Sequence, residues 1–241
     1  MDSTEQIQSN IARVKCQISQ AASRSGRTAG AVRLLAVTKM VGIEAMRAAN
    51  SAGQFLFGEN YVQEARKKLS ELGPSAGYEF HFIGSLQRNK APDAVGLFSL
   101  IHTVDRIELA TVLSEHAGRK NLQQKILLQI NISQEASKSG VDPAQAALLA
   151  KRILGLPNLS LEGVMCIGSY FEPSQADEIR RREFKALHAI RGELERSIGH
   201  ELRELSMGMS HDFELAVEEG ATIVRVGTAI FGERPPKTAS V

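Results

Sequence analysis

The chain has 241 residues, of which 43% are hydrophobic and 23% charged, and its net charge is +2 at pH 7. This composition is typical of a globular protein with a sizeable core, and the small net charge indicates neither a nucleic-acid nor an acidic-membrane partner. Two cysteines, Cys16 and Cys166, are too few for a disulfide framework and indicate reduced thiols in a cytoplasmic protein. No segment approaches the ~18 consecutive apolar residues of a membrane span, and the polar N-terminus does not resemble a signal peptide.

The first segment is predicted to be an amphipathic helix. Ile7, Ile11, Val14 and Ile18 recur every three or four residues, which places them on one helical face. The sequence SGRTAG then ends the pattern, because glycine and small polar residues favour turns. We therefore expect an N-terminal helix within residues 1–27.

From residue 28 onward, short apolar runs alternate with helical segments. Strands are predicted at 32–37, 55–58, 79–84, 97–104, 125–132, 159–167, 204–206 and 222–227. Helices are predicted between them at about 43–52, 60–72, 88–95, 105–117, 142–154, 174–197 and 211–219.

This alternation predicts a parallel sheet, because a crossover helix returns the chain to the same end of the next strand. Eight such units fit a single α/β domain over 1–241, with a TIM (β/α)8-like barrel over 28–234 and a loose tail at 235–241. A doubly wound open sheet is the alternative. It usually binds ligands at a glycine-rich first turn, and the first turn here, TKMVG, lacks that pattern.

A lysine follows the first predicted strand, in the sequence RLLAVTKM. In a TIM barrel the functional groups gather where the strands end, so Thr38 and Lys39 are expected at the barrel mouth. Partial desolvation there makes a neutral lysine amine more available for attack on a carbonyl group. The alternative interpretation is that Lys39 simply points into water. Lys90 and Lys138 lie on the same face, but several residues into loops.

The last two strands end in segments suited to an anion. LSMGMSHD places Ser206, Gly208 and Ser210 just before a helix, and RVGT adds Gly227 and Thr228. Glycine lets backbone N–H groups turn inward, serine supplies hydroxyls, and a helix N-terminus favours negative charge. A helix cap at Ser210 and a tight turn at Gly227 are the alternative. Two such motifs on adjacent strands favour a phosphate site.

A lysine nucleophile beside a phosphate site suggests either pyridoxal phosphate or a sugar-phosphate aldolase. An aldolase needs acid–base partners, for which Glu59 and Asp105 are candidates, although both can simply begin helices. The six histidines show no metal-ligand spacing, so no metal site is predicted. His81 is interpreted as a barrel histidine with its hydrogen bonds satisfied, and Cys166 as core packing.

Several motifs together resemble the pyridoxal phosphate homeostasis protein family (the YggS/PROSC type). They are AVTK, FGENYVQEA, HFIGSLQRNK, QINISQEASKSG, GVMCI and LSMGMSHDFELAVEEGATIVRVGTAIFGER, in this order between residues 32 and 234. The resemblance implies a barrel of the alanine racemase N-terminal type, the fold type III class, that binds pyridoxal 5'-phosphate (PLP). It implies these cofactor-binding residues: Lys39, Asn60, Ser206, Ser210, Arg225, Gly227 and Thr228.

The resemblance also assigns roles to these residues. Lys39 would form a Schiff base with PLP, Asn60 would lie near the ring hydroxyl, and Arg225 would approach the pyridine nitrogen. Ser206, Ser210, Gly227 and Thr228 would hold the phosphate. Because arginine stays protonated, Arg225 would donate to the ring nitrogen without protonating it, which leaves the ring a weaker electron sink.

Two segments depart from the family pattern. Met40 stands where many members have a small or hydroxylated residue, and CIGSY at 166–170 replaces a shorter prolyl segment. Both departures concern the outer face of the cofactor.

The resemblance implies a protein that binds, buffers or delivers PLP without a robust catalytic activity. The alternative is a PLP-dependent amino-acid racemase or decarboxylase. Barrel-type racemases add a C-terminal domain with a tyrosine base, for which the residues after the last strand leave no room. We expect a cytoplasmic monomer with PLP as its ligand and apo PLP-dependent enzymes as transient recipients, and with no nucleic-acid, membrane or metal partner.

Overall fold

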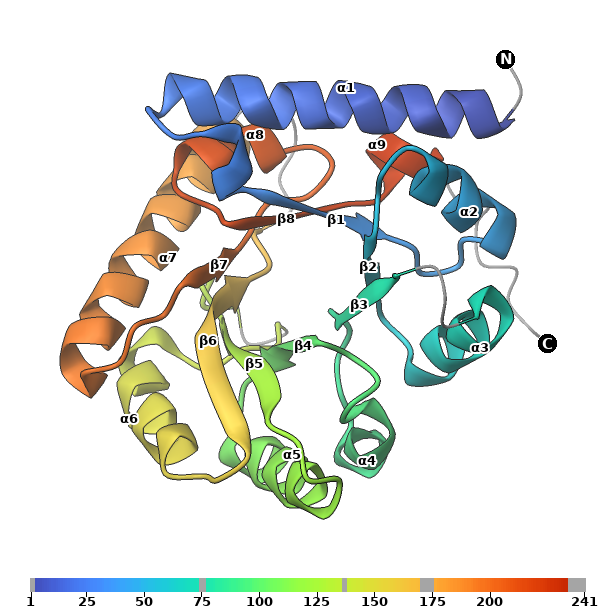
Figure 1. Cartoon of the computed structure of the whole chain (residues 1–241). Helices are drawn as coiled ribbons and strands as arrows, with labels where there is room; N and C mark the ends of the chain where they lie inside the picture. The colour runs from blue at the N-terminus through green and yellow to red at the C-terminus, as the bar shows by residue number, and fades with distance from the viewer. Residues whose placement is uncertain (1–2, 74–76, 136–137, 170–175, 234–241) are drawn as a thin grey trace.

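The computed structural model describes residues 3–73, 77–135, 138–169 and 176–233, and the predicted tail at 235–241 lies outside this part. Its centre is a closed barrel in the order β1 to β8 (Figure 1). The strands are β1 Arg33–Val37, β2 Leu56–Glu59, β3 Glu79–Phe82, β4 Leu100–Val104, β5 Gln124–Ile130, β6 Leu159–Cys166, β7 Glu204–Ser206 and β8 Ile223–Val226.

Every neighbouring pair of strands is parallel, including the pair that closes the barrel. Leu35 is in register with Arg225 of β8, and Ala36 with Phe57 of β2. The predicted TIM-like barrel is therefore confirmed, and the open sheet is excluded. Since all strands run the same way, their C-terminal ends meet at one rim.

Helices surround the barrel. They are α1 Ser3–Arg24, α2 Ile43–Ser51, α3 Val62–Leu72, α4 Ala91–Ala94, α5 Ile107–Arg119, α6 Pro143–Leu154, α7 Ala176–Ile198, α8 Phe213–Glu218 and α9 Thr228–Phe231, with the 3-10 turns η1 Ala29–Ala31 and η3 Arg88–Lys90.

The predicted and observed elements differ most between residues 88 and 100, and the short helix α9 was not predicted. The helix expected over 88–95 is a 3-10 turn followed by α4, whose first turn contains Pro92. Proline fits the first turn of a helix because its missing N–H would have no partner there, so a new helix begins at this point. Gly96 follows with φ of 76°, and β4 begins at Leu100 rather than at residue 97.

The N-terminal helix α1 lies across the outside of the barrel, against α2, α8 and α9 (Figure 1). Its predicted apolar face is confirmed, since Ile11, Val14 and Ile18 are buried. Arg24 pairs with Glu218 at 2.7 Å and so ties the end of α1 to α8.

Two hydrophobic layers stabilise the barrel. The larger fills the space between strands and helices. The smaller lies inside the barrel and consists of Leu35, Leu56, Leu100, Leu127, Met165 and Ile223. Side chains two residues apart on a strand point to the same side, so His102 and Arg225 also face the interior, beyond Leu100 and Ile223. The barrel thus carries a polar layer on the mouth side of an apolar one.

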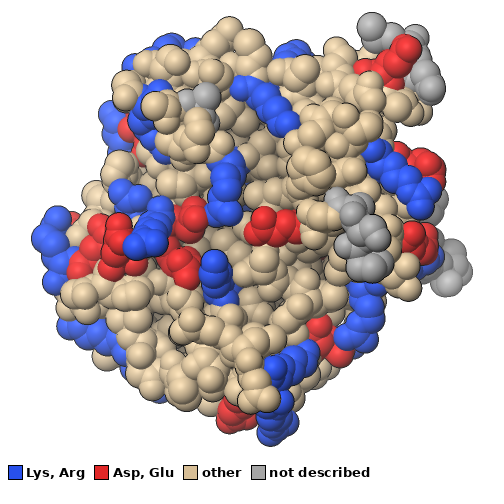
Figure 2. Space-filling model, in the orientation of Figure 1, with Lys and Arg blue, Asp and Glu red and all other residues tan. Residues whose placement is uncertain are grey.

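The surface carries charges of both signs. On the face seen in Figure 2, lysine and arginine side chains alternate with aspartate and glutamate rather than forming separate areas. Among the residues that the structure describes, no helix is long and apolar enough to cross a membrane.

Candidate functional site

Four neighbouring strands, β7, β8, β1 and β2, carry the predicted site residues at their C-terminal ends. Lys39 lies two residues beyond β1 and is half-buried. Asn60 follows β2 directly, and Thr228 lies two residues beyond β8. Because these strands are adjacent and parallel, the three residues lie on one sector of the barrel rim.

Backbone hydrogen bonds fix the turn that carries Lys39. The Thr38 N–H donates to the Gly58 carbonyl at 2.9 Å, and the Val41 N–H donates to the Thr38 carbonyl at 2.9 Å. Met40 adopts φ of 59°, a left-handed backbone conformation that residues other than glycine rarely take. Its side chain is 51% exposed. Its N–H donates to Glu64 Oε1 at 2.6 Å, which holds the turn in this conformation.

A buried ionic cluster supports this turn from beneath. Lys68 Nζ donates to the Thr38 carbonyl at 2.6 Å, and to the carboxylates of Glu59 and Glu64 at 2.7 Å each. Thr38 Oγ1 also donates to Glu59 at 2.6 Å. Burial raises the pKa of Glu59, and the charge of Lys68 opposes that shift. This Lys68 cluster, formed by Thr38, Glu59, Glu64 and Lys68, fixes the carbonyl immediately before Lys39.

Arg225 is buried on the opposite side of the sector. Its Nη1 donates to Ser206 Oγ and its Nη2 to the Cys166 carbonyl, both at 2.8 Å. Burial lowers the pKa of Arg225, but a guanidinium stays charged in proteins. Ser206 is fully buried, and its hydroxyl lies between Arg225 and His102 Nδ1, 3.0 Å from the latter. Ser206 therefore lies deeper in the barrel than the other predicted phosphate residues and contacts Arg225.

The loops after β7 and β8 are joined through Ser210. Its hydroxyl oxygen accepts from the Gly227 N–H at 3.1 Å and from the Ala229 N–H at 3.3 Å. Asp212 shapes the first loop by accepting from the Met209 N–H at 2.5 Å. The arrangement brings the Ser210 hydroxyl and the backbone at Gly227 together at the ends of two adjacent strands, with the Gly227 and Ala229 N–H groups directed at that hydroxyl.

Asn60 borders a hollow of about 450 Å³ lined also by Phe82, Leu86 and Lys90. Its Oδ1 is buried and has no hydrogen-bond partner among the described residues. A side chain at Gly84 would collide with the Asn60 carbonyl, so glycine is required for this close approach of the β2 and β3 ends. The position of Asn60 is thus fixed while its amide oxygen remains unsatisfied.

The other residues named from the sequence form ion pairs, hydrogen bonds or core contacts within the protein. Glu59 belongs to the Lys68 cluster, and Asp105 pairs with Arg106 at 2.6 Å. His81 is a buried barrel histidine with both ring nitrogens bonded, and Cys166 is buried core, as predicted. The described residues contain no group of histidine, cysteine and carboxylate side chains that could hold a metal ion.

No role was predicted from the sequence for two polar residues, Lys68 and His102. The i, i+4 pair of Glu64 and Lys68 has the spacing of an exposed helical ion pair, so nothing marked Lys68 as buried. His102 lies in an apolar strand, and only its alternation with Leu100 could have placed it inside the barrel.

Comparison with known proteins identifies the family. A model of the alanine racemase N-terminal domain matches residues 5–235. The pyridoxal phosphate homeostasis protein of Vibrio cholerae is 43% identical over 231 residues, covering 95% of this chain and 96% of the relative. The protein of that name from Aquifex aeolicus is 42% identical over 224 residues, covering 93% and 96%. The chain belongs to the pyridoxal phosphate homeostasis protein family.

Solved structures agree with this membership. PipY of Synechococcus elongatus PCC7942, in its structure with PLP bound, is 37% identical and superposes with a TM-score of 0.78, covering 89% of this chain and 100% of PipY. Alanine racemase from Corynebacterium glutamicum is 19% identical with a TM-score of 0.73, covering 98% of this chain and 63% of the racemase. The latter similarity shows that the two proteins share a fold, and this confirms the predicted barrel type.

Proposed function

We propose that this protein binds PLP at the mouth sector formed by β7, β8, β1 and β2, and serves PLP homeostasis by binding, buffering or delivering the cofactor. The observation that carries the proposal is the PLP-bound structure of PipY, which is similar over 89% of this chain. The name shared by relatives more than 40% identical supports the same function.

The donor set of the mouth sector suits PLP. A guanidinium has five N–H donors, more than the two bonds that Arg225 makes to Ser206 and Cys166, and can donate to an acceptor such as a pyridine nitrogen. Ser210, Gly227 and Thr228 would hold the phosphate, whereas the hydroxyl of Ser206, expected to hold it as well, contacts Arg225 and His102. The unsatisfied Oδ1 of Asn60 is a buried polar atom that a ligand can satisfy.

Lys39 is the proposed attachment point. PLP brings an aldehyde, with which a lysine amine forms a Schiff base and releases water. The Lys68 cluster fixes the Thr38 carbonyl and the turn after it, so the backbone of Lys39 has a defined position at the barrel mouth. Ser206, held between Arg225 and His102, would act by orienting Arg225.

The relatives are named as homeostasis proteins, and the site residues favour that function over catalysis. Arg225 would leave the pyridine ring unprotonated and hence a weaker electron sink. We therefore propose that the protein has no robust catalytic activity and passes PLP transiently to apo PLP-dependent enzymes. The fold shared with alanine racemase makes racemisation the second candidate function.

A PLP titration followed by visible absorbance tests the proposal. The wild type should develop the absorbance of a Schiff base, and Lys39→Ala should not. Lys90→Ala serves as the matched control, because Lys90 lies beside Asn60 on the same rim and should be dispensable. A wild type that gives only the spectrum of free PLP would contradict the proposal, as would an unchanged spectrum in Lys39→Ala.

Two assays on the PLP-loaded protein then separate homeostasis from catalysis. Transfer of PLP to an apo PLP-dependent enzyme is expected, and its failure would exclude direct delivery. Rapid racemisation of alanine that depends on Lys39 would establish the second candidate function instead.

A further inference from the structure

A series of hydrogen bonds crosses the barrel interior and ends at Arg225. From Ser206 Oγ it continues to His102 Nδ1 at 3.0 Å. His102 Nε2 lies 2.9 Å from His81 Nδ1, and His81 Nε2 lies 3.1 Å from Glu79 Oε1. We call Glu79, His81, His102, Ser206 and Arg225 the interior network.

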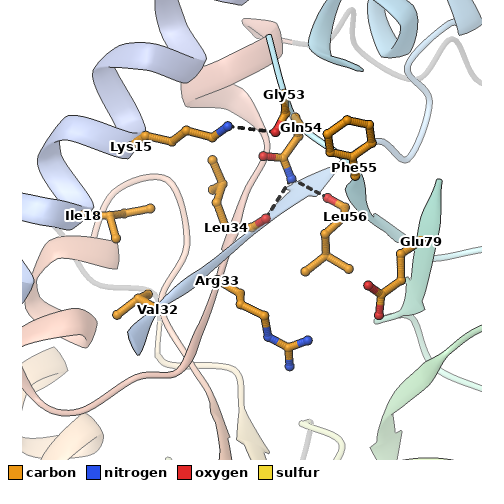
Figure 3. Close-up of a pocket in the computed structure, with 10 residues that line it drawn as sticks. All are labelled: Lys15, Ile18, Val32, Arg33, Leu34, Gly53, Gln54, Phe55, Leu56 and Glu79. Carbon is orange, nitrogen blue, oxygen red and sulfur yellow. Dashed lines mark hydrogen bonds between the residues drawn. The ribbon is translucent and has the colours of Figure 1, made fainter. Parts of the chain in front are cut away.

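The interior network connects the two ends of the barrel. Its two histidines are at most 1% exposed, whereas the Glu79 side chain is 45% exposed. Glu79 opens β3, so it lies at the rim opposite the mouth. Figure 3 shows it there with Arg33, both lining a hollow of about 390 Å³. Solvent thus reaches one end of the network, and Arg225 forms the other.

The chemistry of the two ends fixes the direction of every bond between them. An ionised carboxylate only accepts, so His81 Nε2 must donate to Glu79. The other nitrogen of a neutral imidazole is an acceptor, so His81 Nδ1 accepts from His102 Nε2–H. His102 Nδ1 is then also an acceptor, and the Ser206 hydroxyl must donate to it.

This direction has a consequence at Arg225. Because the Ser206 proton points toward His102, the lone pairs of Ser206 Oγ face Arg225, whose Nη1 donates to them. The opposite tautomer of His102 alone would place two lone pairs against each other between the histidine rings. With Glu79 ionised and both imidazoles neutral, the network is therefore satisfied only in this direction.

The protonation states that this direction needs match the surroundings of the three groups. Burial lowers the pKa of His81 and of His102, which keeps both rings neutral. The hydrogen bond from His81 lowers the pKa of Glu79 to about 2, which keeps the carboxylate ionised at neutral pH.

We propose that the interior network is a positioning element of the cofactor site, in which Glu79 sets the Ser206 hydroxyl through two neutral imidazoles and so orients the Arg225 guanidinium. The effect of the network on PLP rests on the proposed function, whereas the direction of its hydrogen bonds does not. His81 and His102 are positioning residues, since they act on the cofactor only through Ser206 and Arg225.

The direction is tested in the ligand-free wild-type protein by nitrogen NMR of the histidine rings. His81 and His102 should both be neutral at pH 7 and carry their proton on Nε2. A proton on Nδ1 of either ring, or a charged ring, would overturn the proposal. This measurement requires neither PLP nor a variant, so it separates failure of the network from failure of the proposed function.

The effect on the site is tested by PLP binding to His102→Phe, which removes both ring nitrogens, and to His102→Gln, which can still accept and donate. His102→Phe should bind PLP about tenfold more weakly, the scale of one hydrogen bond to a charged group. It should also shift the pH midpoint of the bound cofactor's visible absorbance, because Arg225 would be less well held at the ring nitrogen. His102→Gln should retain more of the affinity.

The matched control is His116→Phe, the same substitution on α5 outside the barrel. It should leave both the affinity and the pH midpoint unchanged. A folded His102→Phe with the affinity and midpoint of the wild type would show that the network is structural only and would overturn the positioning role. If His102→Phe does not fold, nitrogen NMR of the histidine rings in the wild type still tests the network.

Discussion

The two sides of the mouth sector fix their candidate site residues by different means. On the β1–β2 side, the Lys68 cluster uses an ammonium and two carboxylates to fix the turn before Lys39. On the β7–β8 side, Arg225 is held by the Ser206 hydroxyl and a backbone carbonyl, and two buried histidines continue the network beyond Ser206. The difference suits their proposed chemistry. At Lys39 the cluster fixes the preceding backbone carbonyl, whereas at Arg225 the bonds fix the side chain itself.

The largest effect on stability is expected from removing the cation of the Lys68 cluster. Lys68→Met leaves Glu59 buried without its cation, so the free energy of unfolding should fall by about 3 kcal/mol. Urea denaturation measures this. Lys67→Met is the matched control, since its side chain is 80% exposed and lies 3.8 Å from Glu71, and it should change stability by less than about 0.5 kcal/mol.

A second variant sharpens this prediction. Because Glu59→Gln removes the buried negative charge, the double variant Lys68→Met/Glu59→Gln should lose less stability than the sum of the two single changes. Strict additivity would mean that the two residues do not act as one cluster.

The histidines of the interior network and Glu59 of the Lys68 cluster should make stability depend on pH in opposite directions. The lowered pKa values of His81 and His102 mean that the unfolded chain binds more protons below about pH 6.5. Stability from these rings is therefore lost as pH falls, by at most about 1.4 kcal/mol per histidine per pH unit. Glu59 has a raised pKa, so it contributes the opposite slope above its unfolded value of 4.5.

Urea denaturation between pH 7.5 and 5.5 measures the net slope. The wild type should lose stability toward pH 5.5, and the slope of His102→Phe should be smaller. A slope that does not change in His102→Phe would indicate that His102 is not held neutral.

A smaller effect is expected where the two loops of the β7–β8 side meet. Ser210→Ala removes the acceptor for the Gly227 and Ala229 N–H groups, so stability should fall by about 1 kcal/mol. Affinity for PLP should also fall. The control Ser70→Ala, on the exposed face of α3, should stay within about 0.5 kcal/mol of the wild type. Equal stability and affinity in Ser210→Ala and Ser70→Ala would contradict the assigned role.

The smallest expected effect concerns the thiols. Burial raises the pKa of Cys166 to about 12, whereas Cys16 is exposed on α1. A thiol reagent at pH 8 should therefore modify Cys16 and leave Cys166 unmodified until the protein unfolds. Rapid modification of Cys166 in the folded protein would show that the hydrophobic layer between the strands and the helices opens to solvent at β6.

Local patterns predicted most of the fold. All eight predicted strands are present, because short apolar runs bounded by helices leave few alternatives. The apolar face of α1 followed from its period. The errors lie near Pro92 and Gly96, where turn residues set the bounds of the elements. Neither the 3-10 turn nor the late start of β4 has a periodic signal in the sequence.

The sequence predicted the placement of the candidate site residues at strand ends, but not the buried contacts below them. Lys39, Gly227 and Thr228 follow strands, and parallel topology alone brings strand ends together. The burial of Lys68 depends on how α3 packs beneath the turn after β1, and the contact of His102 with Ser206 crosses the barrel interior. Such contacts arise from closure of the whole barrel, so no local pattern contains them.

The most direct test of the central claim is to locate the attachment point of PLP. The PLP-loaded wild type is reduced with borohydride, digested, and its peptides are identified by mass spectrometry. The account predicts a pyridoxyl group on Lys39 and none on Lys68 or Lys90. A label on another lysine instead, or no label on a protein that binds PLP, would contradict it.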